Sequence, residues 1–177
     1  MPPIHDLAAH YQHLLTTDQL IDTRDHLPLF RSLRGRILEI GCNVGNSTTA
    51  FLVGESESVT SIDINPACAE NFPGCAKWRF ICGDSRGRIT FAQVKAEQFD
   101  VLYIDGAHDF DSASSDLAAY SKLVRRNGTI LVHDVLATDN FPGVWRAFNE
   151  FRWYTTSGMV QGKYILPGSY GLGVIEL

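Results

Sequence analysis

The sequence has no run of basic residues and no long apolar run. Lysine and arginine are scattered and the formal net charge is −5, which argues against a surface that follows nucleic-acid phosphates or anionic lipid. No apolar segment reaches the length of a membrane span, and the N-terminal stretch MPPIHDLAAHYQHLL lacks the basic and apolar regions of a secretory signal. We therefore expect a cytoplasmic protein that binds a small molecule and neither nucleic acid nor a membrane.

The sequence also lacks closely spaced cysteines, repeats and low-complexity linkers. Its 4 cysteines form no CxxC pair, so we expect reduced, mostly buried thiols rather than a disulfide framework or a local zinc site. Nothing marks an internal domain boundary within the 177 residues. The expectation is a single domain, in which residues 1–34 form a helical or irregular segment on the substrate side and residues 35–177 form the ligand-binding part.

Short β-branched segments alternate with helical stretches along the chain. Strands are predicted at residues 36–41, 58–64, 78–84, 99–105 and 128–134, and Asn127-Gly128 is interpreted as the stop of the preceding helix. Two further strand-like segments, GMVQGKYIL and YGLGVIEL, are separated by the turn residues PGS. The pattern predicts an α/β fold, a Rossmann-like three-layer αβα sandwich whose mostly parallel seven-stranded sheet ends in an antiparallel C-terminal strand pair.

A helix is predicted between the fifth strand and the tail, within NFPGVWRAFNEFRWY. Helical spacing indicates that Trp145, Phe148 and Phe151 share a buried stripe. Trp153 and Tyr154 are then candidates for a wall of the substrate site or for the contact between the subunits of a homodimer.

Polar residues collect where the predicted strands end. Gly41 follows the first strand and Asp63 ends the second. Asp84, Asp105 and Asp134 end the third, fourth and fifth. Ligands bind outside the carboxyl ends of the strands in open α/β sheets, so we expect these residues at one site.

The first of these turns predicts an adenosine-binding site. Gly41 and Gly45 let the backbone bend sharply and approach a ligand, and Asp63 follows about twenty residues later, the spacing of a carboxylate that binds ribose hydroxyls. Asn43 replaces the middle glycine of the dinucleotide motif, and Glu39 would repel a pyrophosphate but attract the ammonium group of a methionine moiety. Charge therefore favours S-adenosylmethionine over NAD.

These motifs carry a family resemblance. The segments ILEIGCNVGNST, SIDINP, CGDS, FDVLYIDGAHDFDSASSDL and LVRRNGTILVHDV stand in the order and spacing of class I S-adenosylmethionine-dependent methyltransferases, which the chain resembles over nearly its whole length. More narrowly, it resembles a small bacterial group with Y-I-D-G-x-H after the fourth strand and H-D after the fifth. It is also similar to metal-dependent sugar and catechol O-methyltransferases.

The resemblance implies that residues 35–177 are a methyltransferase domain that binds S-adenosylmethionine. The implied cofactor-binding residues are Glu39, Gly41, Asn43, Gly45, Asp63, Ile64, Asp84, Ser85 and Asp105. Glu39 and the glycines would surround the methionine and the ribose. Asp63 would bind the ribose hydroxyls, and Asp84 with Ser85 would lie beside the adenine.

Two aspartates suggest a metal site beside the cofactor. Asp105 and Asp134 end neighbouring strands, so their carboxylates should converge and would repel each other without a positive charge between them. A divalent cation such as Mg²⁺ meets this requirement with oxygen ligands. By resemblance Asp105 and Asp134 are metal ligands, and His133 stands where some relatives carry a further acidic ligand.

His108, three residues after Asp105, is the candidate general base. An imidazole titrates near neutrality, and the similar sugar O-methyltransferases carry a histidine at this spacing. Plainer interpretations stay open: Asp105 can cap the next helix, His108 can be a loop histidine, and His133 can point into the structure. The approach of Asp105 to Asp134 favours the interpretation in which Asp105 and His108 are catalytic.

The hypothesis for the chain is O-methylation of a small-molecule hydroxyl. S-adenosylmethionine is the expected cofactor, Mg²⁺ or a similar divalent cation the expected metal, and His108 the expected base. One alternative is an NAD-dependent oxidoreductase, which Glu39 and Asn43 disfavour. The other is a protein that binds S-adenosylmethionine without catalysis.

Overall fold

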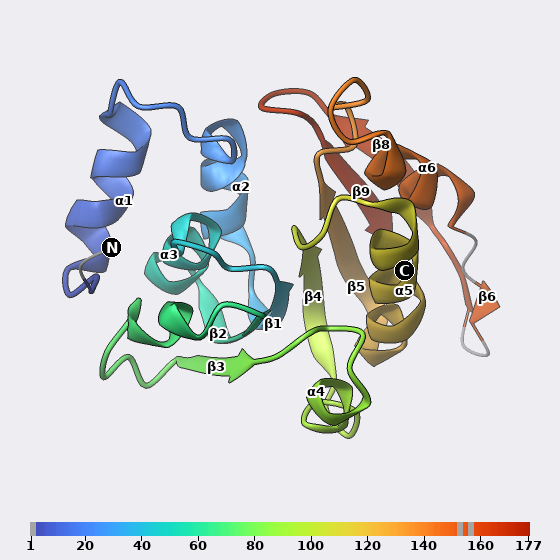
Figure 1. The fold of residues 1–177 in the computed structure, drawn as a ribbon, viewed down its shortest axis with the longest axis horizontal. Coiled ribbons are helices and arrows are strands. Elements are labelled where there is room, and N and C mark those ends of the chain that lie inside the picture. The colour runs from blue at the N-terminus through green and yellow to red at the C-terminus, as the bar shows by residue number, and fades with distance from the viewer. Residues whose placement is uncertain (1–2, 152–153, 156–157) are drawn as a thin grey trace.

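A mixed β-sheet crosses the centre of the molecule (Figure 1). The computed structural model describes residues 3–151, 154–155 and 158–177. The strands of the sheet are β1 (Gly35–Ile40), β2 (Ser56–Asp63), β3 (Trp78–Cys82), β4 (Phe99–Ile104), β5 (Val124–His133), β8 (Gly162–Leu166) and β9 (Leu172–Glu176). Within the described residues, these seven strands are ordered β3-β2-β1-β4-β5-β9-β8. The first five pair in parallel, and β9 and β8 are antiparallel to their neighbours, which confirms the predicted sheet.

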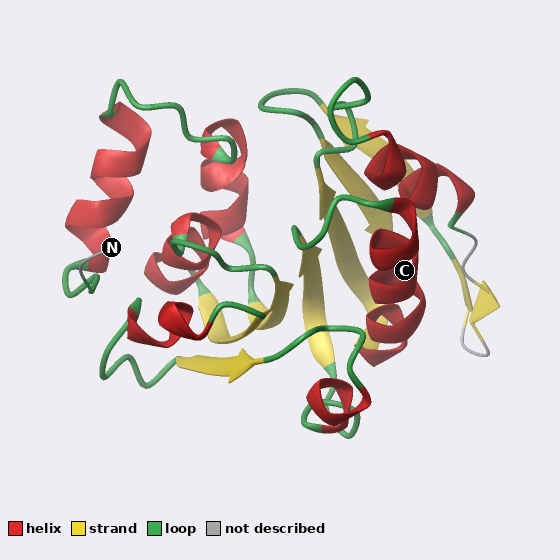
Figure 2. Cartoon of the chain, in the orientation of Figure 1, coloured by secondary structure: helices red, strands yellow, loops and turns green. Residues whose placement is uncertain are grey.

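Helices cover both faces of the sheet (Figure 2). One face carries α1 (Leu7–Thr16), α2 (Leu27–Ser32) and α3 (Asn46–Val53), and the other carries α4 (Arg88–Ala92), α5 (Phe110–Tyr120) and α6 (Pro142–Glu150). Short 3₁₀ segments are η1 (Arg24–His26), η2 (Pro66–Glu70) and η3 (Ser121–Leu123). The strands β6 (Tyr154–Thr155) and β7 (Gly158–Met159) form a separate pair.

The two layers of helices enclose two hydrophobic cores. Along β1, Ile37 packs into the core beside α1 to α3, whereas Leu38 and Ile40 pack into the core beside α5 and α6, because successive side chains of a strand point to opposite faces. By the same alternation Glu39 faces α3. Phe30 of α2 is fully buried in the first core, so residues before the first strand complete one layer of the sandwich.

The start of β5 differs from the prediction. α5 ends at Tyr120, and β5 begins at Val124 rather than at residue 128. Asn127-Gly128 is therefore not a helix stop. Asn127 has a φ of 63° inside the strand, where the pairing with β4 shifts its register, so the turn-forming pair makes an irregularity in a strand instead of ending a helix.

The aromatic stripe of α6 is also narrower than predicted. Phe148 is buried at 4 % exposure and Phe151 packs partly against the core, but Trp145 is 42 % exposed. Trp145 lies beside Val144, the residue that takes the core-facing position in its place. Trp153 and the side chain of Tyr154 lie outside the described residues.

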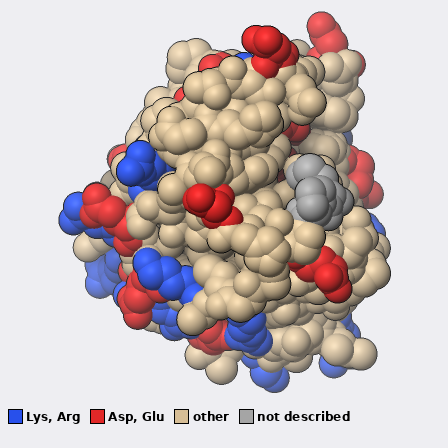
Figure 3. All heavy atoms as spheres, turned by 90° about the vertical axis from the view of Figure 1, so that its left-hand side faces the viewer, with Lys and Arg blue, Asp and Glu red and all other residues tan. Residues whose placement is uncertain are grey.

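On the described part of the face in Figure 3, most Lys and Arg side chains lie in the lower half of the view, with Asp and Glu side chains among them. In the part of the chain that the structure describes, no helix combines the length and the apolar character that crossing a membrane requires.

Candidate active site

A cavity of about 400 Å³ lies at the carboxyl edge of the sheet. Its lining includes seven of the predicted cofactor residues, namely Gly41, Asn43, Asp63, Ile64, Asp84, Ser85 and Asp105, and also His108. Arg86, Gly106 and Ser112 line it too, and none of them is among the predicted site residues. Residues that follow four different strands thus meet at one site, as expected for an open parallel sheet.

The turn after β1 owes its shape to a glycine and a carboxylate. Gly41 has a φ of +85°, and a Cβ atom there would lie 2.1 Å from the carbonyl oxygen of Asp105, so only glycine allows the two loops to approach this closely. Asp63 Oδ2 accepts hydrogen bonds from the backbone N–H groups of Cys42 (3.0 Å) and Asn43 (2.8 Å). Asp63 therefore shapes the turn as well as lining the cavity.

Glu39 and Gly45 do not line the cavity. Glu39 is 0 % exposed and accepts hydrogen bonds from Ser47 (2.6 Å), Thr48 (2.7 Å) and Ser61 (2.5 Å). Burial raises the pKa of Glu39 to about 7, although these hydroxyls oppose the shift. The position of Glu39 in β1 directs its side chain toward α3 and not into the cavity. The structure therefore does not place Glu39 where it could contact the methionine ammonium group of a ligand in the cavity.

Gly45 begins α3 with a φ of +89°, and a Cβ atom there would lie 2.6 Å from the Phe72 ring. The structure gives this glycine a packing role beside the turn rather than a place at the cavity wall.

Asp105, Asp134 and His108 form the expected polar cluster. His108 Nε2 lies 2.7 Å from Asp134 Oδ2 and 3.9 Å from Asp105 Oδ1. Ligand atoms of the three residues all lie within 4.8 Å of one another. The Tyr103 hydroxyl donates a 2.8 Å hydrogen bond to Asp105 Oδ2, which holds that carboxylate from the strand side.

His133 contacts the same two carboxylates but is buried and does not line the cavity. Its ring is 2 % exposed and lies edge-on to His26 at 5.7 Å. Nδ1 is 3.1 Å from Asp134 Oδ1 and 3.5 Å from Asp105 Oδ1, without the geometry of a hydrogen bond. The ligand atoms that group within 4.8 Å come from Asp105, Asp134 and His108, and the role of His133 as a metal ligand stays a prediction.

The charged groups of the cluster shift one another's pKa. The hydrogen bond to Asp134 raises the pKa of His108. Burial opposes a charge on His133, but the carboxylates of Asp105 and Asp134 raise its pKa. Burial likewise opposes ionisation of Asp134, yet the two histidines hold its pKa well below the usual range. The carboxylates thus favour the protonated form of both imidazoles, and the imidazoles favour the ionised form of Asp134.

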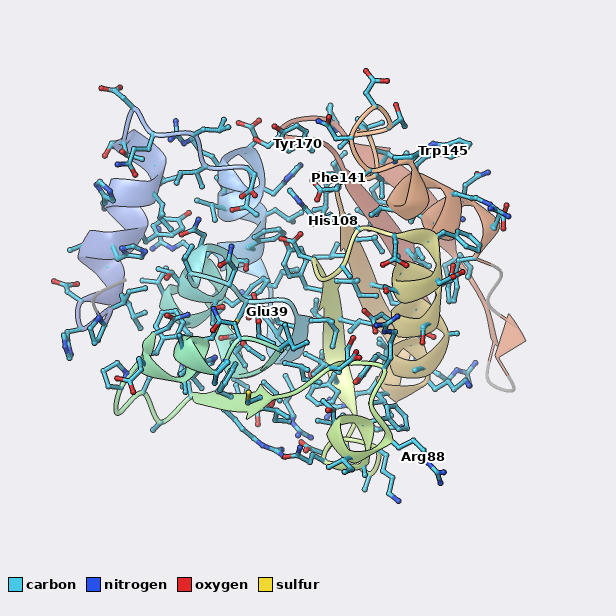
Figure 4. The ribbon with its side chains drawn as sticks, viewed as in Figure 1. Glu39, Arg88, His108, Phe141, Trp145 and Tyr170 are labelled. Atoms are coloured by element: carbon cyan, nitrogen blue, oxygen red, sulfur yellow. The ribbon has the colours of Figure 1, made fainter. Side chains whose placement is uncertain are left out.

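Two residues near the cluster were missed by the sequence motifs. Phe141 stacks on the His108 ring with centroids 4.1 Å apart, and Figure 4 shows the two side by side with Tyr170 beyond them. Asp22 is the second of these residues. Burial raises the pKa of its carboxyl, and the negative charges of Asp105 and Asp134 raise it further. No local motif marks either residue, because both contacts join distant parts of the chain.

Residues 38–135 match the family model of a methyltransferase domain. The chain belongs to this methyltransferase family. Its sheet order is that of the class I Rossmann-like methyltransferase fold. The assignment favours this enzyme class over the NAD-dependent alternative.

Solved structures resemble the methyltransferase in fold. MycE of the mycinamycin biosynthetic pathway, solved with Mg and S-adenosylhomocysteine, is 16 % identical with a TM-score of 0.65 over 99 % of this chain and 55 % of its own. An O-methyltransferase from Bacillus cereus is 18 % identical with a TM-score of 0.65 over 99 % of this chain and 92 % of its own. The methyltransferase thus spans about half the length of MycE. No curated protein matches it.

Proposed function

We propose that this methyltransferase transfers the methyl group of S-adenosylmethionine to a hydroxyl group of a small molecule, assisted by a divalent cation. The observation that carries the proposal is the convergence of Asp105, Asp134 and His108 beside a cavity that Asp105 and His108 also line. Two carboxylates can bind a cation and an imidazole can accept a proton. A weakly acidic hydroxyl needs both kinds of help before it attacks a methyl group.

The cavity suits an adenosine cofactor in size and in its polar groups. Its volume of about 400 Å³ is in the range of small-molecule sites. Asp63 lies in the lining together with Asp84 and Ser85, and carboxylate oxygens are the acceptors that ribose hydroxyls need. The activated methyl group comes with the cofactor, so the protein supplies alignment and proton removal.

The donor set suits a hard divalent cation. Asp105 and Asp134 offer the oxygen ligands that Mg²⁺ prefers, with donor atoms of the cluster within 4.8 Å of one another. A bound cation would polarise an acceptor hydroxyl and make it more acidic. The magnesium in MycE and the fold that the two chains share support this proposal.

His108 is the proposed base. Its Nε2 is held by Asp134 at 2.7 Å, and its ring is held by Phe141. In the neutral ring the Nε2–H group donates to Asp134, so Nδ1 has the lone pair that can accept the proton of the acceptor hydroxyl. A cation bound to Asp134 would weaken the pull of that carboxylate on the protonated imidazole. The small-molecule nature of the acceptor is part of the proposal, and the methyl transfer to oxygen is supported by the Bacillus cereus neighbour.

The proposal is tested by calorimetric titration with S-adenosylhomocysteine and by assays with a panel of hydroxylated acceptors. We expect His108→Gln to keep its affinity for S-adenosylhomocysteine and to lose about 100-fold or more in turnover, because the base is removed and the cavity is kept. Asp134→Asn should lose activity that depends on added Mg²⁺, and a chelator should do the same to the unchanged enzyme. His13→Gln, an exposed histidine of α1, serves as the matched control.

Three results would contradict parts of the proposal. Absence of S-adenosylhomocysteine binding would contradict the cofactor. Full turnover in His108→Gln would contradict the base, and activity that is unaffected by a chelator and by Asp134→Asn would contradict the metal.

A further inference from the structure

Two cysteines that lie far apart in the sequence meet beside a wall of the cavity. Cys42 belongs to the turn after β1, and Cys68 lies in η2. Both are buried, with exposures of 3 % and 2 %. Their Sγ atoms and a carboxylate oxygen of Asp63, at the end of β2, all lie within 4.8 Å of one another. Two thiols and a carboxylate at such separations are a donor set for a metal ion with a preference for sulfur.

Hydrogen bonds hold these three groups on separate elements. The Cys68 thiol donates to the backbone carbonyl of Asn43 at 3.1 Å, and Asn71 Nδ2 donates to the same oxygen at 2.8 Å. The backbone N–H of Cys42 donates to Asp63 Oδ2 at 3.0 Å. The set therefore joins the turn after β1, the end of β2 and η2, and its donor atoms are arranged in advance of any ion.

Asp63 brings a negative charge that no basic side chain balances. In the part of the chain that the structure describes, it forms no ion pair with a lysine, an arginine or a histidine. Its oxygens accept hydrogen bonds from the backbone N–H groups of Cys42, Asn43 and Asn65. A cation beside Asp63 would thus be attracted by the carboxylate without competition from a neighbouring positive side chain.

We propose that Cys42, Cys68 and Asp63 form a second metal site, for a thiophilic divalent cation such as Zn²⁺. On binding, both thiols release their protons to solvent. Two thiolates and the carboxylate then coordinate the ion, and the fourth position of a tetrahedral Zn²⁺ is left for water. Sulfur donors favour Zn²⁺ over Mg²⁺, whereas the carboxylates of Asp105 and Asp134 suit Mg²⁺. The two sites therefore differ in the cation that they prefer.

Asp63 connects the second metal site with the cavity. It lines the cavity, and the two cysteines do not, so the carboxylate gives an ion a route to the buried thiols. A carboxylate oxygen that coordinates Zn²⁺ is no longer available to a ligand in the cavity. Zn²⁺ and the cavity ligand should therefore weaken each other's binding. This consequence, unlike the metal site itself, rests on the proposed use of the cavity for the cofactor.

The test follows metal binding through the absorption of metal–thiolate bonds. The reference protein is Cys75→Ser/Cys82→Ser, which lacks the two less buried cysteines and keeps the proposed site. It is titrated with Cd²⁺, which shares the preference of Zn²⁺ for thiolates, in the presence of a phosphine reductant. We expect one ion per chain to bind with a Kd in the micromolar range or tighter and to produce a near-ultraviolet charge-transfer band, which oxygen and nitrogen ligands do not give. Zn²⁺ should displace Cd²⁺, and excess Mg²⁺ should not.

Single variants of the reference protein identify the ligands. Cys42→Ser and Cys68→Ser should each weaken Cd²⁺ binding by about 100-fold or more, because one of two thiolates is lost. Asp134→Asn changes the other cluster and should leave the charge-transfer band as it is. Should Cys42→Ser fail to fold, Cys68→Ser, on the separate element η2, decides the question.

Competition with the cavity ligand tests the part of Asp63. Saturating Zn²⁺ should weaken the binding of S-adenosylhomocysteine to the reference protein by about tenfold. The weakening should disappear in Cys68→Ser, which keeps the cluster of Asp105, Asp134 and His108. The comparison therefore separates Zn²⁺ bound at the thiols from Zn²⁺ bound at that cluster.

Two results would overturn the metal site: no charge-transfer band at millimolar Cd²⁺, or an undiminished Cd²⁺ affinity in both cysteine variants. An affinity for S-adenosylhomocysteine that Zn²⁺ leaves unchanged would remove Asp63 from the donor set. Failure of the metal-free reference protein to bind S-adenosylhomocysteine would instead contradict the proposed function, and the absorption titration would still decide the metal site.

Discussion

At the scale of single residues, Glu39 lies outside the lining of the cavity at which the sequence places it. The sequence indicates its charge and its place before the glycine turn, but the alternation of β1 turns its side chain under α3, where hydroxyls of Ser47, Thr48 and Ser61 surround it. We infer that Glu39 braces the strand and the helix that carry the turn.

The buried carboxyl of Glu39 predicts a pH dependence of stability. Its pKa of about 7 in the folded protein stands above the usual value of 4.5, so between these values the folded state holds a proton that the unfolded chain releases. Its contribution is therefore complete at low pH and is lost as the pH rises through about 7. Gln does not ionise, so Glu39→Gln does not show this loss. The unfolding free energy of the variant minus that of the unchanged protein should increase by roughly 3 kcal/mol from about pH 4 to about pH 8.

Denaturant unfolding at several pH values measures this difference directly. The control is Glu57→Gln, a change at an exposed acidic residue of β2. The unfolding free energy of Glu57→Gln should change with pH in the same way as that of the unchanged protein. A Glu39→Gln curve that is also parallel would show that Glu39 titrates alike in both states.

Prediction from sequence was strongest for residues whose role follows from strand order. Asp63, Asp105 and Asp134 end parallel strands, and the rule that such ends meet at one edge brings them together in the structure. Phe141 escaped prediction because its role depends on its contact with the ring of His108, which lies far from it in the sequence. Contacts of that kind follow from packing, which a single sequence does not encode as a local pattern.

At the scale of elements, the loop after β4 packs so closely against the turn between β1 and α3 that the turn has no room for a side chain at Gly41. A Cβ atom on Gly41 would lie 2.1 Å from the Asp105 carbonyl oxygen, and its φ is +85°. Gly41→Ala should therefore lose about 2 kcal/mol or more of stability and much of its affinity for S-adenosylhomocysteine, because the turn and the loop after β4 must separate.

Gly74 supplies the matched control for Gly41→Ala. It also has a positive φ, +74°, but a Cβ atom there would meet nothing within 4 Å. Gly74→Ala therefore carries only the backbone strain, about 1 kcal/mol, and should bind S-adenosylhomocysteine normally. Equal losses of stability and affinity in the two variants would contradict the steric explanation.

Element boundaries were predicted less well than element types. The strands and their mostly parallel pairing agree with the alternating pattern, whereas β5 starts before Asn127-Gly128 and not after it. A left-handed Asn followed by Gly is compatible with a helix end and with an irregular strand. Only the pairing with β4 distinguishes the two, and that pairing is a property of the sheet.

At the scale of the whole molecule, the N-terminal segment is tied to the catalytic edge through the core. Phe30 of α2 packs against Tyr103 of β4 with ring centroids 4.9 Å apart, and the Tyr103 hydroxyl donates to Asp105. The segment before the first strand therefore packs against the tyrosine that hydrogen-bonds Asp105, a candidate metal ligand, and it also completes one layer of the sandwich.

This connection predicts the effect of removing the Phe30 ring. Phe30 is 0 % exposed, and Phe30→Ala should lose about 3–5 kcal/mol of unfolding free energy because a large cavity opens in the core. Leu20→Ala, at an 85 % exposed side chain of the same segment, should change stability little. Denaturant unfolding of both variants would decide whether residues 1–34 are integral to the fold. A loss below about 1 kcal/mol in Phe30→Ala would mean that the segment is an appendage, and the sheet with its catalytic edge would then have to be stable without it.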